Sequence, residues 1–132
     1  MSRINRRFAV TKVTRKPECG FVTDTRADTV IVEEPLELRA GETINTTMRT
    51  PGHDIELAHG WLYAEGLIKR AEDVITARYC AGSQNPEGTN TYNLLNIDLA
   101  SSAKPLTPDF IRLTPTTSAC GVCGSASIEQ VA

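Results

Sequence analysis

Residues 50–68 read Thr-Pro-Gly-His-Asp-Ile-Glu-Leu-Ala-His-Gly-Trp-Leu-Tyr-Ala-Glu-Gly-Leu-Ile, and this stretch decides the fold that we expect. A threonine hydroxyl can cap a helix and proline suits the first helical position, so a helix is predicted to begin at Thr50. The dense apolar spacing from Ile55 to Ile68 predicts burial of most of the helix circumference. Gly66 is the expected end. We therefore expect this to be the central helix of the fold.

Short stretches of β-branched residues flank this helix on both sides and predict strands. The segment across Gly41 is expected to return as a hairpin partner, and a second hairpin is expected after the helix. Together these patterns indicate an α/β fold, with α+β as the alternative. The expected strands cover residues 7–14, 28–33, 36–39, 43–48, 74–81 and 91–99, with a turn at 16–20.

Length and composition narrow the class of protein. The 132 residues leave room for one domain, and 14 basic against 16 acidic residues give no electrostatic basis for non-specific nucleic-acid binding. No apolar run is long enough to span a membrane, and no apolar signal segment follows the N-terminus. We therefore expect a cytoplasmic protein whose four cysteines are reduced thiols.

The sharpest chemical motif is Cys120-Gly-Val-Cys123, because thiols at this spacing can meet across one turn. Dithiol exchange and persulfide relay both use such a pair, and so does metal ligation, which needs two further ligands. The residues from 114 to 127 are almost all small or polar, which predicts a mobile loop around the two cysteines. Cys19 is expected in a turn and Cys80 at a strand end, without a chemical role.

The start of the predicted helix is a second candidate site. Free backbone amides and the helix dipole favour an anion there, Arg49 would add a fixed positive charge, and Gly52 would allow close approach of a phosphate. Ordinary helix capping explains the same residues and is the favoured interpretation on spacing alone. His53 and Glu56 share a helix face, where a solvated or hydrogen-bonded pair is favoured over a metal or acid-base role. His59 is expected to be a packing residue.

Four blocks together resemble the formate dehydrogenase accessory sulfurtransferase family, FdhD. Their order and content make the resemblance specific, and it extends from residue 28 to residue 128. The blocks are Asp28-Thr-Val-Ile-Val-Glu-Glu-Pro-Leu-Glu-Leu38, Thr47-Met-Arg-Thr-Pro-Gly-His-Asp54, Glu56-Leu-Ala-His-Gly-Trp-Leu-Tyr-Ala-Glu-Gly-Leu-Ile68 and Cys120-Gly-Val-Cys-Gly124.

The resemblance implies a sulfurtransferase that takes persulfide sulfur from a cysteine desulfurase and passes it to a molybdenum bis-molybdopterin guanine dinucleotide, the cofactor of formate dehydrogenase. By the matching motif, Cys120 would carry the persulfide and Cys123 would support it. Arg49, Thr50, Gly52 and His53 are the candidate contacts for the cofactor phosphates. The cofactor would be an acceptor substrate, so no permanently bound cofactor and no metal are expected. A homodimer is the expected assembly.

The family also implies a cytidine deaminase-like fold, a mixed sheet with packed helices. Zinc deaminases use H-x-E with P-C-x-x-C, whereas this chain has His53-Asp-Ile-Glu56 and Ala119 before Cys120, so deaminase chemistry is disfavoured. Members of the family are longer than 132 residues. The chain is therefore expected to be a single domain or the N-terminal part of a longer sulfurtransferase.

Two other functions compete with sulfur transfer. A zinc-binding C-x-x-C scaffold without catalytic activity is the main alternative, although no second close-spaced pair of cysteines or histidines is present. Thioredoxin-like exchange ranks last, because no βαβ pattern leads into the C-x-x-C.

Overall fold

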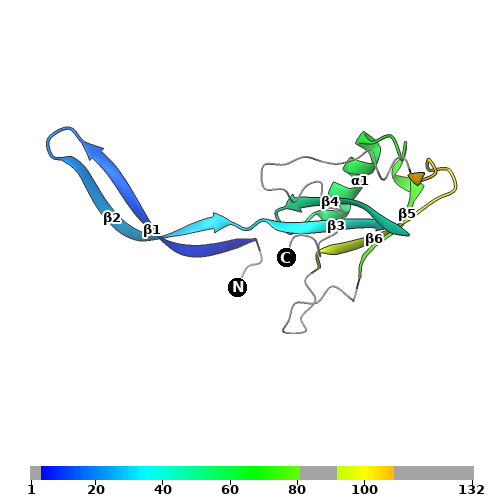
Figure 1. Cartoon of the computed structure of the whole chain (residues 1–132), viewed down its shortest axis with the longest axis horizontal. Helices are drawn as coiled ribbons and strands as arrows, with labels where there is room; N and C mark the ends of the chain where they lie inside the picture. The colour runs from blue at the N-terminus through cyan, green and yellow to red at the C-terminus, as the bar shows by residue number, and fades with distance from the viewer. Residues whose placement is uncertain (1–3, 81–91, 109–132) are drawn as a thin grey trace. The chain divides into compact units, whose positions relative to one another are not determined.

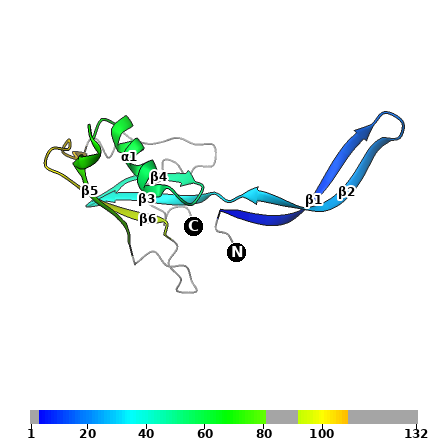
Figure 2. The ribbon, with the colours of Figure 1, turned by 180° about the vertical axis from the view of Figure 1, so that it is seen from behind.

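The computed structural model describes residues 4–80 and 92–108 (Figures 1 and 2). Contacts group the chain into two compact units, residues 1–33 and residues 34–132. The first unit holds a two-stranded sheet, and the second holds a four-stranded sheet with one α-helix among its described residues. The loop predicted over residues 114–127 lies outside the described residues, and the single domain expected over residues 1–132 stays a prediction.

The first unit is a long antiparallel hairpin of β1 (Asn5–Lys16) and β2 (Gly20–Ile31). The strand predicted over residues 7–14 and the turn after it are confirmed. The start of β2 is eight residues earlier than predicted, because pairing with β1 extends over residues whose own alternation is weak. Gly20 begins β2 with a φ of 74°, a backbone conformation that glycine adopts without steric cost.

The second unit contains a mixed sheet with the strand order β4-β3-β6-β5. Its strands are β3 (Glu34–Ala40), β4 (Glu42–Arg49), β5 (Val74–Tyr79) and β6 (Leu94–Leu99). The β3–β4 and β5–β6 pairs are antiparallel, which confirms both predicted hairpins, while β3 and β6 run parallel. Gly41 has a φ of 79° in the turn between β3 and β4. The fold is thus a mixed α+β arrangement.

The helix α1 (Asp54–Ala64) begins four residues later than predicted. The prediction that Thr50 caps the helix is wrong: the N-cap residue is His53, whose φ of 49° is left-handed, and its side chain forms no capping hydrogen bond. Gly52 also has a positive φ, of 113°, so residues 52 and 53 cannot continue a right-handed helix.

The C-terminal end of α1 is where the sequence predicts it. Gly66 has a φ of 73°, its N–H donates to the carbonyl of Tyr63, and the Leu67 N–H donates to the carbonyl of Leu62. These two bonds form a Schellman motif, which satisfies carbonyls that a helix end leaves without partners. After the helix, the chain forms a short 3-10 turn, η1 (Ala71–Asp73), and enters β5.

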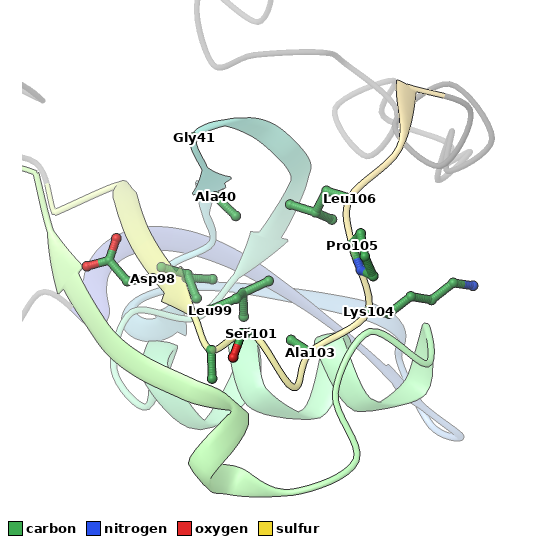
Figure 3. Close-up of a pocket in the computed structure, with 11 residues that line it drawn as sticks. Ala40, Gly41, Asp98, Leu99, Ser101, Ala103, Lys104, Pro105 and Leu106 are labelled. Carbon is green, nitrogen blue, oxygen red and sulfur yellow. The ribbon is translucent and has the colours of Figure 1, made fainter.

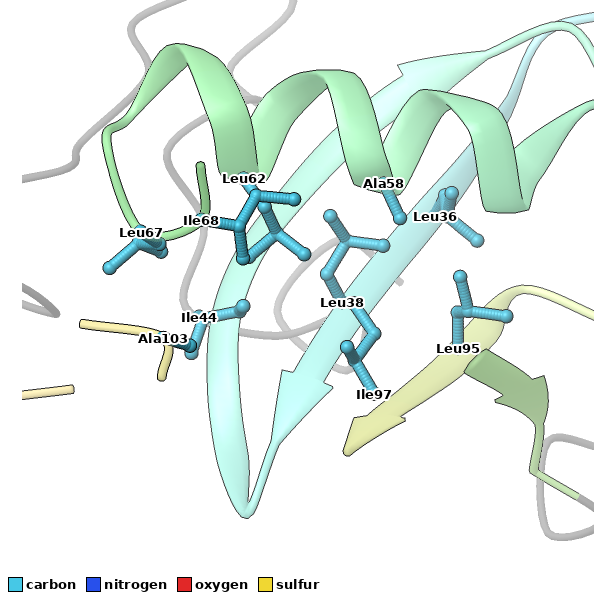
Figure 4. Packing of buried hydrophobic residues seen from close by; sticks show 10 residues of the cluster. All are labelled: Leu36, Leu38, Ile44, Ala58, Leu62, Leu67, Ile68, Leu95, Ile97 and Ala103. Carbon is cyan, nitrogen blue, oxygen red and sulfur yellow. The ribbon is translucent and has the colours of Figure 1, made fainter. Parts of the chain in front are cut away.

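The hydrophobic core lies between α1 and the four-stranded sheet (Figure 4). Ala58 and Leu62 of the helix point toward Leu36 and Leu38 of β3. The prediction that most of the helix circumference is buried is wrong, because Ile55 and Leu57 are 41% and 40% exposed. A helix that packs on one sheet face buries one stripe only. The full core cluster is Leu36, Leu38, Ile44, Ala58, Leu62, Leu67, Ile68, Leu95, Ile97 and Ala103.

Within the part of the chain that the structure describes, no helix has the length and apolar character needed to cross a membrane.

Candidate functional site

The start of α1 is built around a buried ion pair between Arg49, the last residue of β4, and Asp54, the first residue of the helix. Their side chains are 5% and 1% exposed. Arg49 Nε donates to Asp54 Oδ1 and Arg49 Nη2 donates to Asp54 Oδ2, both at 3.0 Å. Two parallel bonds of this kind fix the relative orientation of the two groups as well as their distance. The pair therefore determines where the helix begins relative to the strand.

Further groups form hydrogen bonds with this ion pair. Arg49 Nη2 also donates to the backbone carbonyl of Tyr92 at 3.0 Å and to Asn93 Oδ1 at 3.1 Å. Tyr79 donates its hydroxyl hydrogen to Asp54 Oδ2 at 2.9 Å. We call Arg49, Asp54, Tyr79, Tyr92 and Asn93 the arginine clamp. It ties the end of β5 and the start of β6 to the helix start.

Arg49 Nη1 faces the first residues of β3. It lies 3.4 Å from the backbone carbonyl of Glu34, 3.5 Å from that of Pro35 and 3.6 Å from the Glu34 carboxylate. The guanidinium is thus surrounded by acceptors from its own chain. A phosphate would have to displace them to reach Arg49, so the structure gives this residue a positioning role that the capping interpretation did not include.

The other predicted cofactor contacts lie at the surface, where the chain passes from β4 into α1. We call this segment, residues 50–53, the corner. Thr50, Gly52 and His53 are exposed, and the His53 side chain is 92% exposed. His53 Nδ1 lies 3.6 Å from Glu56 Oε1, and both side chains are exposed, so the two residues form the solvated pair that their spacing allows. The first turn of α1 has backbone N–H groups that its own hydrogen-bond ladder does not use, and it presents them beside these residues. An anion could therefore approach the corner along its Gly52–His53 side.

The cysteine motif itself, Cys120 and Cys123, lies outside the described residues, so its geometry stays a prediction. Cys19 is a free, exposed thiol in the turn between β1 and β2, and Cys80 is a free, partly buried thiol directly after β5. Both positions match the sequence prediction. Within residues 4–80 and 92–108, no three side chains of the metal-binding types lie close enough to hold an ion.

His59 lies in the middle of α1, where its ring nitrogen Nδ1 is 2.8 Å from the backbone carbonyl of Ile55. This is a hydrogen bond within one turn of the helix. The imidazole therefore bonds to its own helix, and the expectation that His59 has no chemical role stays a prediction.

Sequence reasoning missed a second acidic anchor, Asp73. Its carboxylate accepts hydrogen bonds from the backbone N–H groups of Lys69 at 2.8 Å and Arg70 at 3.1 Å, and from the Ser102 hydroxyl at 2.7 Å. The bonds from Lys69, Ser102 and Arg70 lower the pKa of Asp73 to about 2, with a further contribution from the Arg70 charge. Asp73 ties the turn after α1 to the segment after β6.

The described residues also line an open hollow of about 390 Å³ between the β3–β4 turn and the segment after β6 (Figure 3). Ala40 and Leu106 point toward one another across it, whereas the Lys104 side chain extends away. Residues 97–106 form most of its wall. Arg49, Thr50, Gly52 and His53 are not among the described residues that line this hollow, so it does not extend the corner around His53.

The fold and this corner define a mixed α+β protein in which a buried ion pair holds an exposed helix start. Comparison with known sequences gives the family. The sequence model of the FdhD/NarQ family matches residues 31–132. The chain belongs to the FdhD/NarQ family. No solved structure matches the chain, so the cytidine deaminase-like fold stays a prediction.

Three curated relatives illustrate the similarity, and each is named sulfur carrier protein FdhD. The protein from Corynebacterium efficiens is 51% identical, over 99% of this chain and 48% of its own length. Those from Mycobacterium tuberculosis and Nocardia farcinica are 49% and 50% identical, over 81% and 80% of this chain and 40% and 37% of their own lengths. The chain thus spans about half the length, or less, of the curated relatives that it matches.

Proposed function

We propose that this chain takes part in sulfur transfer, as the sulfurtransferase component that carries persulfide sulfur to the molybdenum cofactor of formate dehydrogenase. One observation carries the proposal: the family match extends over residues 31–132 and so includes Cys120-Gly-Val-Cys123, in a family whose relatives are named sulfur carriers. The proposed donor is a cysteine desulfurase. The acceptor is a molybdenum bis-molybdopterin guanine dinucleotide, and the proposed setting is a cytoplasmic homodimer.

The first chemical step is a thiol-persulfide exchange. The Cys120 thiolate attacks the terminal sulfur of the desulfurase persulfide, a new S–S bond forms on Cys120, and the desulfurase thiolate leaves as the old S–S bond breaks. No external oxidant or reductant is consumed. Cys123 lies three residues away in sequence and supports the carrier thiol. In the second transfer the acceptor would supply the electron pair for its new bond to the terminal sulfur, the S–S bond of the persulfide would break, and Cys120 would leave as its thiolate.

The corner at the start of α1 is the proposed binding site for a phosphate of the acceptor cofactor. The support is geometric: Gly52, His53 and Thr50 are exposed there, beside first-turn backbone N–H groups of the kind that bind anions. Within this proposal, Arg49 acts mainly by holding the corner, because its guanidinium is already engaged by Asp54. The Glu56 carboxylate lies 3.6 Å from the imidazole and works against an anion, so the proposed contacts come from the exposed Gly52–His53 side.

Mass spectrometry tests the sulfur-carrier proposal directly. The purified chain is incubated with a cysteine desulfurase and cysteine, and we expect a reductant-labile adduct of about 32 Da, one sulfur atom, on Cys120. Cys120→Ala should abolish the adduct, and Cys123→Ala should reduce it less. Cys19→Ala and Cys80→Ala are the matched controls and should leave it unchanged. An adduct that persists in Cys120→Ala contradicts the proposal, and stoichiometric zinc without an adduct would favour the scaffold alternative.

Guanosine diphosphate binding tests the proposed phosphate site. His53→Asn keeps a residue type that tolerates the left-handed conformation but removes the imidazole, and we expect weaker binding. Lys69→Gln, an exposed cation elsewhere in the same unit, is the control. Equal affinities of the wild type and His53→Asn would show that His53 does not contribute to the phosphate site.

A further inference from the structure

The hairpin β1–β2 is an exposed two-stranded ribbon, and it points to a function separate from the proposed sulfur transfer. Every residue of β2 is exposed and so is every residue of β1 except Val10, which is partly buried. Large apolar side chains are among them: Phe21 is 72% exposed and Ile31 is 70% exposed. A two-stranded hairpin without a core is marginal by itself in water, and an additional strand would stabilise it.

The outer edge of β1 is available for such a strand. Among the described residues, β1 pairs only with β2, so alternate N–H and C=O groups of β1 point away from its partner. An edge of this kind accepts an extended peptide through main-chain hydrogen bonds. Affinity can then come from the backbone, while side chains select the partner.

The side chains of β1 select for negative charge. The strand carries five basic residues and no acidic one, whereas β2 carries two acidic residues and one basic residue. The basic residues are Arg6, Arg7, Lys12, Arg15 and Lys16. Like charges that face one another across strands are destabilising, so this edge disfavours pairing with the β1 of a second copy.

The two faces of the ribbon differ, and the difference favours a protein over a nucleic acid. Alternation of the register places Arg7, Arg15 and Phe21 on one face, which carries no carboxylate within residues 5–16 and 20–31. The opposite face holds Asp24 and Asp28, and Arg26 lies 3.7 Å from Asp28. The carboxylates on that face would repel a nucleic acid that surrounded the ribbon. A single strand added at the β1 edge lies beside the basic residues and does not need to contact those carboxylates.

We propose that the β1 edge is a docking site for an extended acidic segment of a partner protein, which adds to the ribbon as a third strand beside Arg7 and Arg15. The partner segment is one that alternates carboxylates with apolar or β-branched residues. Its carboxylates lie on the face of Arg7 and Arg15, and its apolar residues lie on the opposite face, where they cover exposed positions such as Phe8. The main-chain bonds supply affinity and the charges supply selectivity.

The test uses the whole chain and a fluorescent ten-residue peptide that alternates glutamate with valine and threonine. We expect saturable binding by anisotropy that weakens with salt, together with slower hydrogen exchange of β1 amides. The double variant Arg7→Gln, Arg15→Gln should bind about two- to twenty-fivefold more weakly, the range for losing two exposed ion pairs. The control, Lys69→Gln with Lys104→Gln, makes the same change in net charge in the other unit and should bind normally.

Two further peptides and one oligonucleotide make the test decisive. A peptide with lysine in place of glutamate, and an acidic peptide N-methylated at every residue, should both fail to bind; equal binding by either overturns the proposal. Absence of binding by the acidic peptide also overturns it. In that case, binding of a DNA duplex would point to a nucleic acid, and concentration-dependent dimers with protected β2 amides would point to a second copy.

Discussion

Replacement of Asp54 is the sharpest test of the arginine clamp. Asp54→Asn keeps the shape of the side chain but removes the charge that faces the buried guanidinium of Arg49. Loss of one partner of a buried ion pair costs about 3–5 kcal/mol. The Glu34 carboxylate, 3.6 Å from Arg49 Nη1 and 22% exposed, offsets part of the loss, so we expect about 3 kcal/mol.

Urea denaturation of the whole chain measures this cost. With an m-value of about 1–3 kcal/mol/M, a loss of about 3 kcal/mol lowers the midpoint by roughly 1–3 M. Arg49→Met should be comparably harmful, and the double variant Arg49→Met, Asp54→Asn should be more stable than the sum of the single losses by about 2 kcal/mol, because the two residues interact directly. Glu56→Gln, an exposed acid in the same helical turn, is the control and should change stability by less than about 0.5 kcal/mol.

Milder variants keep the test informative where Asp54→Asn unfolds the chain. Tyr79→Phe removes one hydrogen bond to a charged group and should cost about 1.5–3 kcal/mol. Additive losses in the double variant, or a change below about 1 kcal/mol in both Asp54→Asn and Tyr79→Phe, would refute the clamp. If Arg49 were instead a ligand contact, its replacement would weaken nucleotide binding and leave the urea midpoint unchanged.

Three further predictions concern the rest of the second unit. Asp73→Asn should lower the urea midpoint at pH 6, and the difference from wild type should shrink as pH falls from about 4 toward 2. The reason is that the carboxylate, with a pKa of about 2 in the folded state, stabilises the fold only while it is ionised. A constant difference over this pH range would contradict that role. Leu62→Ala should lower the free energy of unfolding by about 2–5 kcal/mol in the same assay, whereas Leu57→Ala, on the exposed side of α1, should lower it far less. Equal losses would contradict the observed orientation of the helix. Gly66→Ala should lower the stability of the fold by about 1–2 kcal/mol, because Gly66 has a positive φ, while Gly60→Ala inside the helix should raise it by about 0.5–1 kcal/mol. Thermal midpoints measure both changes, and a higher midpoint for Gly66→Ala would contradict the Schellman motif at the end of α1.

Much of the local structure follows from the sequence. Alternation in the strands and the glycines at positions 41 and 66 predict both hairpins of the four-stranded sheet and the end of α1, because these signals depend on near neighbours. The start of α1 is not predictable in the same way. Thr50 and Pro51 resemble a helix start, but the pairing of Arg49 with Asp54 requires the left-handed corner at Gly52 and His53.

The candidate site shows the same division. The order of the four blocks in the sequence was enough to predict the family, which the family match confirms. The sequence also indicates the helix start and the cysteine pair as candidate sites, and their chemistry stays a prediction. The enclosure of Arg49 by Asp54, Tyr92 and Asn93 follows from the tertiary structure alone. Tyr92 and Asn93 are 43 and 44 residues from Arg49, and no local pattern encodes such contacts. Their geometry arises when β5 and β6 pair and the helix packs on the sheet, because burial of a charge requires partners from every adjacent element.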